Sequence, residues 1–186
     1  MHIISDSTGY DAATLSLADA AAVADKAKPW RIVGGHMVNL HIVRGKLKAP
    51  LRLTRDADLA VELKSITEGG LVGRLMKLGY TNPVYHNRFD RDVDGLALSI
   101  DLVVPSYSTK HQPNIDALVI KVDGMPGVDA AFERKPEIVE LVVDLTDGRR
   151  REFAVQLPDA VTAVANVLPA GQRPSLMPSA STTSSR

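Results

Sequence analysis

The chain of 186 residues contains no cysteine, which excludes disulfide scaffolds and zinc–thiolate sites and fits a reducing cytoplasm. Its 22 basic and 22 acidic residues cancel. Nucleic-acid binding through overall charge is therefore excluded, although binding through a local basic patch is not. No apolar run approaches the roughly 20 residues of a membrane span, and the N-terminus lacks the basic-then-apolar pattern of a signal peptide. We therefore expect a cytoplasmic protein without membrane contact.

The composition is that of a globular protein, with 45% hydrophobic and 24% charged residues. The length suits one domain of ordinary size. Residues 1–13 are polar, and we expect them to be loosely ordered. Residues 14–168 carry the patterned segments and form the predicted domain. Residues 169–186 are rich in proline, serine and threonine, which predicts a disordered tail.

Apolar spacing predicts a mixed order of helices and strands. The predicted helices are 15–28, ended by Pro29, and 36–44, 67–78 and 160–168. The predicted strands are 30–33, 57–63, 84–89, 96–104, 118–122, 137–145 and 151–157. This order favours an α+β fold, in which helices flank one mixed β-sheet.

Two acidic turns join predicted strands. Asp147-Gly148 lies between the last two strands and is typical of a tight hairpin. Residues 90–95, with sequence DRDVDG, join the strands 84–89 and 96–104. This segment also resembles the first half of a calcium-binding loop, but that loop needs a helix on each side. Because the flanks are strand-like, we interpret it as an acidic hairpin turn.

Asp56 and Asp58 stand at the start of a predicted strand. Alternate residues of a strand face the same side, so the two carboxylates would lie roughly 6–7 Å apart on one face. Two such charges repel unless a positive group lies between them. Oxygen ligands select Mg²⁺ or Mn²⁺, so the pair predicts a divalent metal site, although a solvated strand edge is the simpler alternative.

Asp101 and the pair Gly34-Gly35 extend this candidate site. Asp101 is a single acid within an apolar strand, where an unpaired charge is costly, so a neighbouring strand could bring it beside Asp56 and Asp58. The two glycines lie between a strand and a helix, where free backbone N–H groups can contact phosphate oxygens. Taken alone, each feature has an ordinary structural explanation, an edge-strand acid or a tight turn.

Together these segments resemble the DNA-polymerase-beta-like nucleotidyltransferase superfamily. They are Val33-Gly34-Gly35-His36, the segment 52–59 with sequence RLTRDADL, and Ile100-Asp101-Leu102-Val103. Within that superfamily, the pattern resembles the small bacterial AbiEii-type, MenT-like enzymes, many of which are toxins of toxin–antitoxin pairs. The resemblance extends over roughly residues 30–160, about two-thirds of the chain.

The resemblance implies a nucleotidyltransferase-like fold and a metal-dependent transfer of a nucleotide from an NTP to a hydroxyl. Asp56, Asp58 and Asp101 would be the catalytic, metal-binding acids. Gly34, Gly35, Arg52 and Arg55 would contact the nucleotide. The implied acceptor is RNA, often the tRNA 3′ end, and the implied protein partner is a cognate antitoxin. A nucleotidyltransferase that acts on a small molecule is a weaker alternative.

The chain departs from the family pattern after the segment 157–161. Relatives carry a lysine on a later helix and then an Arg-Asp helix, whereas this chain has no lysine after Lys135 and no acid after Asp159. We therefore expect a C-terminal truncation or frameshift relative to the family. The alternative function that follows is a catalytically inactive remnant of the fold, which binds a nucleotide or a protein partner.

Basic residues and histidines near the candidate site allow further contacts. Residues 44–55 form the densest basic stretch and could contact RNA or triphosphate, although such stretches are often solvated loops. His36 could touch phosphate at a helix start, whereas we expect His41 to be half-buried and structural. His86 and His111 have no metal-ligand spacing to a partner.

Overall fold

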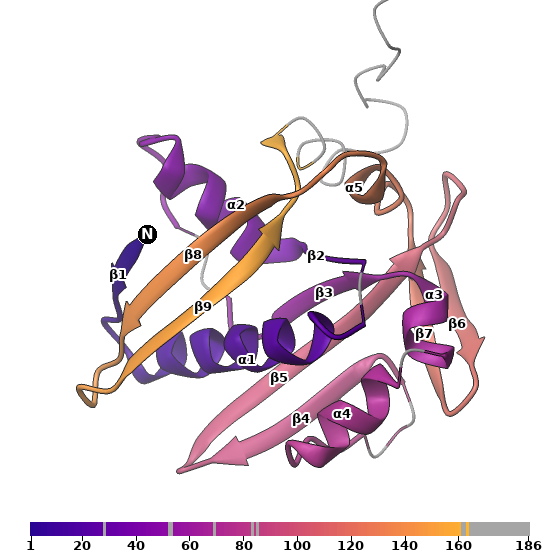
Figure 1. Cartoon of the computed structure of the whole chain (residues 1–186), viewed down its shortest axis with the longest axis horizontal. Coiled ribbons are helices and arrows are strands. Elements are labelled where there is room, and N and C mark those ends of the chain that lie inside the picture. Colours follow the sequence, from indigo (N-terminus) through magenta and orange to yellow (C-terminus); the bar gives the residue numbers. More distant parts are fainter. Residues whose placement is uncertain are drawn as a thin grey trace, which may run out of the picture.

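The computed structural model describes residues 1–27, 29–51, 54–68, 70–82, 84, 86–160 and 163, and within them the chain forms two β-sheets and five helices (Figure 1). The helices are α1 Thr8–Ala24, α2 Gly34–Arg44, α3 Leu63–Thr67, α4 Leu71–Lys77 and α5 Ala130–Glu133. The strands are β1 His2–Ile4, β2 Trp30–Ile32, β3 Ala57–Val61, β4 Arg88–Val93, β5 Leu96–Pro105, β6 Gln112–Ala117, β7 Ile120–Met125, β8 Glu137–Asp144 and β9 Arg150–Leu157.

The larger sheet is mixed, which confirms the predicted α+β class. Its strand order is β2-β3-β5-β7-β6, and β4 also pairs with β5. The neighbours β3, β5 and β7 run parallel, whereas β2, β4 and β6 each pair antiparallel. The smaller sheet has the order β1-β8-β9, so the fold holds two sheets where the sequence predicted one. Its β8–β9 hairpin is the one that the Asp-Gly turn predicted.

Helix α1 lies between the two sheets, in contact with β3 and β5 of one and β9 of the other (Figure 1). Its many alanines explain this position, because small side chains let a helix approach both sheets closely. Ala13 and Ala20 are fully buried. The helix begins at Thr8, earlier than the predicted residue 15, because the Ser7 side chain caps it by accepting the Tyr10 N–H at 3.3 Å. It ends at Ala24.

The N-terminal residues are more ordered than the sequence predicted. Residues 1–13 form β1, which pairs parallel with β8, and the first turns of α1. The Asp11 carboxylate is buried and accepts the Thr146 N–H at 3.2 Å. Their polar composition gave no sign of this order, because a short strand is stabilised by its neighbour rather than by its own apolar pattern.

The acidic segment after residue 88 is a strand, which corrects the sequence prediction. Strand β4 spans Arg88–Val93, whereas the prediction gave a strand at 84–89 and a turn over 90–95. The turn itself is only Asp94-Gly95, and both residues have positive φ, 54° and 80°, as a two-residue hairpin turn requires. Charged residues suit β4, because β5 is its only partner strand among the described residues. A calcium loop is therefore excluded.

Two further predictions need correction. The predicted helix 67–78 is shorter in the structure: α4 begins at Leu71, after Gly70 with φ +63°, and Thr67 ends the separate helix α3. The predicted strand 118–122 is a turn followed by β7, since Leu118 has φ +62° and is 79% exposed. The strand before that turn, β6, carries few apolar residues and was not predicted.

The C-terminal predictions mostly fall outside the described residues. Of the predicted helix 160–168, Ala160 and Ala163 are helical and the others are not described. The predicted tail 169–186 lies outside the described residues. None of the helices in the described ranges combines the length and apolarity needed to cross a membrane.

Strand β5 separates the core from the face that carries the candidate site. Leu98, Ile100 and Leu102 are almost fully buried on the side of α1. The alternating residues Ser99, Asp101 and Val103 face the other side. Packing of the first set therefore fixes the direction of the second.

We predict that Ile100→Ala lowers the free energy of unfolding by about 2–5 kcal/mol, because Ile100 is fully buried and the change leaves a cavity. Ile138→Ala is the matched control, since Ile138 is 56% exposed and the same change there should cost less than about 1 kcal/mol. Urea unfolding of the two variants measures the difference. Equal losses would contradict the position assigned to β5.

Candidate functional site

The three predicted acids lie on one side of the larger sheet. Strands β3 and β5 are parallel neighbours, and Asp58 stands directly opposite Asp101 in their register. Neighbouring strands lie about 4.8 Å apart, so both carboxylates occupy one small area. Asp56 precedes β3 and, by strand alternation, faces the same side. The structure thus brings together residues more than 40 positions apart in the chain.

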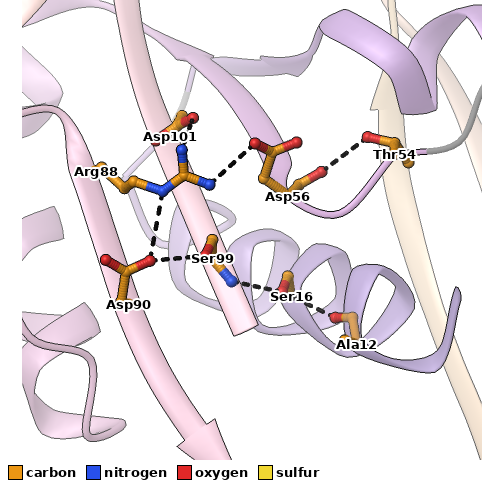
Figure 2. A network of polar contacts seen from close by, with 8 residues as sticks. All are labelled: Ala12, Ser16, Thr54, Asp56, Arg88, Asp90, Ser99 and Asp101. Atoms are coloured by element: carbon orange, nitrogen blue, oxygen red, sulfur yellow. Dashed lines mark hydrogen bonds and ion pairs between the residues drawn. The ribbon is translucent and has the colours of Figure 1, made fainter. Parts of the chain in front are cut away.

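Arg88 of β4 lies between two of these acids, and the sequence analysis missed it (Figure 2). Its Nη2 lies 3.1 Å from Asp56 Oδ2, and its Nη1 lies 3.6 Å from Asp101 Oδ2. Its Nε lies 3.4 Å from Asp90 Oδ1. The sequence predicted a metal ion between Asp56 and Asp58. In the structure, a guanidinium of the chain itself lies between Asp56 and Asp101.

A short polar network continues from this arginine to α1 (Figure 2). The Ser99 hydroxyl donates to Asp90 Oδ1 at 2.6 Å, and the Ser99 backbone N–H donates to the Ser16 hydroxyl at 3.1 Å. The Ser16 hydroxyl in turn donates to the Ala12 carbonyl at 2.9 Å. The position of Asp90 is therefore tied to the buried helix through Ser99.

The backbone of the two glycines lies against the Asp58 carboxylate. The backbone N–H of Gly35 donates to the Asp58 carboxylate. Gly34 has φ +63°, and a Cβ there would lie 1.9 Å from Asp58 Oδ2. At Gly35, a Cβ would lie 2.9 Å from the Thr54 hydroxyl oxygen. Both positions therefore need glycine, because the backbone lies too close to Asp58 at Gly34, and to Thr54 at Gly35, to leave room for a side chain.

Burial and repulsion make Asp58 a weak acid. Burial chiefly, and then the charges of Asp56 and Asp101, raise the pKa of Asp58 to about 7, although the Gly35 N–H and Arg88 oppose this. Burial also raises the pKa of Asp101, against the effect of Arg88. Asp101 Oδ1 is buried without a hydrogen-bond partner among the described residues. Acidic side chains with raised pKa values that lie within one small area are typical of functional sites.

The donor chemistry fits Mg²⁺ or Mn²⁺, because all three candidate ligands are carboxylates and one buried oxygen lacks a partner. Among the described residues, however, no three acidic or histidine side chains are already arranged to hold a metal ion. Arg88 explains this, since its guanidinium separates Asp56 from Asp101. The three acids would therefore hold a cation only after a rearrangement of that arginine.

His36 follows the glycines and is neutral. It is buried, its ring hydrogen-bonds to the Ala13 backbone, and its Nε2 has no partner among the described residues. Burial lowers its pKa to about 4, although Asp56 acts in the opposite direction. His41 is half-buried and contacts the Pro158 carbonyl at 2.9 Å, which confirms its structural role.

The remaining predicted contacts lie at or beyond the edge of this site. Arg55 is exposed, next to Asp56 in the chain. Arg52 lies outside the described residues. The basic segment 44–51 is exposed, and its Arg44 forms an ion pair with Glu137.

Two histidines meet at one carboxylate, which the sequence did not predict. His86 Nε2 lies 3.6 Å from Asp123 Oδ1, and His111 Nε2 lies 3.5 Å from Asp123 Oδ2. Asp123 of β7 stands opposite Val103, two residues beyond Asp101 on the same face of β5. Tertiary pairing of β5 with β7 brings these groups together, and no sequence spacing carries that information.

One pocket borders the site and another lies away from it, and neither is lined by the three candidate acids. One of about 330 Å³ is lined by Asp90 and Ser99 of the Arg88 network, together with Thr81. Another of about 280 Å³ lies against α1 and β9, between Asp19 and three arginines, 91, 149 and 151. It includes none of the candidate acids. We base the assignment on the carboxylates, because they carry the reactive chemistry whereas the pockets are small for a nucleotide.

Comparison with known proteins adds no identification: no protein-family model, no curated protein and no solved structure matches the chain.

We predict that Gly34→Ala destabilises the protein by more than Gly148→Ala. Both glycines have positive φ, which costs alanine about 1–2 kcal/mol at either position. Only Gly34 also places the new Cβ against the Asp58 carboxylate, whereas nothing lies within 4 Å of a Cβ at Gly148. Urea unfolding of both variants isolates the clash. Equal losses would mean that Asp58 is not held against the glycine turn.

We also predict that ionised Asp58 lowers stability. Its raised pKa means that the folded protein binds more protons than the unfolded chain between pH 3.8, the ordinary value, and about 7. Stability contributed by this group is therefore lost as pH rises through that window. In EDTA, the free energy of unfolding of Asp58→Asn should rise relative to that of wild type between pH 4 and pH 7.5, by on the order of 1–3 kcal/mol. A constant difference across this range would contradict the shift.

Proposed function

We propose that the protein is a metal-dependent nucleotidyltransferase with a DNA-polymerase-beta-like fold, of the AbiEii, MenT-like kind. The observation that carries this proposal is the alignment of Asp58 with Asp101 on the parallel strands β3 and β5, with Asp56 on the same face. Three carboxylates on one face could supply the ligands for the metal ions of a two-metal phosphoryl transfer. The mixed sheet and helix α2, which begins at the glycine pair, also support the proposal.

Each acid then has a role in the transfer. Asp56 and Asp58 would hold Mg²⁺ or Mn²⁺, with Asp101 as the third ligand. When bound there, such a cation would supply positive charge to the triphosphate and the attacking oxygen. Asp101 would accept the proton of the acceptor hydroxyl, which suits the raised pKa of its carboxyl. The hydroxyl oxygen forms a bond to the α-phosphorus, and the bond to the bridging oxygen breaks as pyrophosphate leaves.

The resemblance of the motifs supplies the acceptor and the partner of this proposal. The acceptor would be RNA, at a tRNA 3′ end, held locally by exposed basic residues of the segment 44–55. Gly34, Arg52 and Arg55 would contact the triphosphate. Gly35 would do so only by sharing or releasing its N–H, which Asp58 now accepts. A cognate antitoxin would be the protein partner, in the cytoplasm where the RNA is found.

One observation favours a second candidate, a catalytically inactive remnant of the same fold. The guanidinium of Arg88 already lies between Asp56 and Asp101, where an active enzyme would need a metal ion. If that ion pair were permanent, the fold would persist and bind a nucleotide or a partner without turnover.

We predict that the purified protein, with Mg²⁺, each labelled NTP in turn and total tRNA, incorporates label into RNA. Asp58→Ala should reduce incorporation at least about 100-fold, because it removes a metal ligand. Asp116→Ala is the control, since Asp116 is exposed on β6 and should leave the rate unchanged. No incorporation at high protein concentration would support the remnant. Label on small hydroxyl compounds, and not on RNA, would move the acceptor to a small molecule.

A further inference from the structure

Arg88 makes more acidic contacts than a simple surface ion pair. Its three guanidinium nitrogens face three different carboxylates, those of Asp56, Asp90 and Asp101, at 3.1, 3.4 and 3.6 Å. Asp56 precedes β3, whereas Asp101 belongs to β5, so the guanidinium connects two strands that carry the candidate ligands. Removing it would leave the acids without a counter-charge among the described residues that is equally close.

The guanidinium nevertheless compensates the acids incompletely. Asp101 Oδ1 remains buried without a hydrogen-bond partner among the described residues, and Asp58 forms no ion pair with Arg88 within 4 Å. The Arg88 side chain is 46% exposed, so it has a path to solvent. The site therefore still has a carboxylate oxygen that could bind a cation, and the Arg88 side chain can move out toward solvent.

A divalent cation and the guanidinium cannot both lie between Asp56 and Asp101, since two positive charges at that separation repel. A guanidinium binds phosphate as well as carboxylate, through the same planar pair of donors. A polyphosphate that enters with the metal would thus offer Arg88 a new partner at the moment when its carboxylates become metal ligands.

We propose that Arg88 is an internal counter-ion of the acidic site, which a divalent cation displaces efficiently only when it arrives together with a polyphosphate. This deepens the proposed function and rests on it. Arg88 thereby selects the metal–polyphosphate complex over the free metal ion as the form that binds. A purely structural role, in which Arg88 only ties β4 to β3, predicts no such selection.

Equilibrium dialysis with Mn²⁺ tests the proposal, because it counts Mn²⁺ retained with the protein, with or without equimolar inorganic tripolyphosphate. Wild type should retain Mn²⁺ weakly alone and much better with tripolyphosphate. Arg88→Gln should retain Mn²⁺ alone about tenfold more tightly, because one competing positive charge is gone, and should gain less from tripolyphosphate. Arg88→Lys keeps the charge but not the planar donor pair, and should retain Mn²⁺ alone as weakly as wild type.

Arg150→Gln is the matched control, since Arg150 is a similarly exposed arginine paired with Asp144 in the other sheet. It should behave as wild type. The proposal would be overturned if Arg88→Gln bound Mn²⁺ no more tightly than wild type, or if tripolyphosphate raised the Mn²⁺ affinity of the two proteins equally. If Asp101→Asn bound Mn²⁺ as tightly as wild type, the proposed metal site itself would be wrong. If the Mn²⁺ results are as expected but no nucleotide is incorporated, only the proposed transfer reaction fails.

Discussion

The repulsion between carboxylates at the β3–β5 pair is the constraint on which the site depends. Asp58 and Asp101 are placed opposite each other by a strand register that the buried residues of β3 and β5 fix from the other face of the sheet. The fold therefore forces like charges together, and some cation must compensate them. In the structure, Arg88 supplies that charge in part.

The surroundings of the site stabilise this arrangement. Helix α1 lies between the two sheets and fixes β5 both by packing and through the contact from Ser99 to Ser16. The turn at Gly34-Gly35 brings backbone against Asp58 and donates one N–H to it. The free energy that it costs to crowd these carboxylates together is thus offset by apolar packing and hydrogen bonds in the rest of the fold, as is common at functional sites.

Much of this arrangement could be predicted from the sequence. The spacing of Asp56 and Asp58 predicted their shared face, and the single acid in an apolar strand, Asp101, was expected beside them. Arg88 was missed because the strand before the acidic turn was placed four residues too early. The signal was present: with Asp94-Gly95 as a two-residue turn, counting outward pairs Arg88 with Asp101. By contrast, the meeting of His86, His111 and Asp123 depends on the order of strands in the sheet, which local patterns do not encode.

The central claim is that the three acids form one cation site from which Arg88 withdraws. A crystal structure of the protein grown with Mn²⁺ and tripolyphosphate, with anomalous scattering recorded for manganese, tests it most directly. The account predicts a manganese peak in contact with Asp56, Asp58 and Asp101, and the Arg88 guanidinium turned onto phosphate oxygens. Manganese bound elsewhere, with Arg88 still between Asp56 and Asp101, would contradict it.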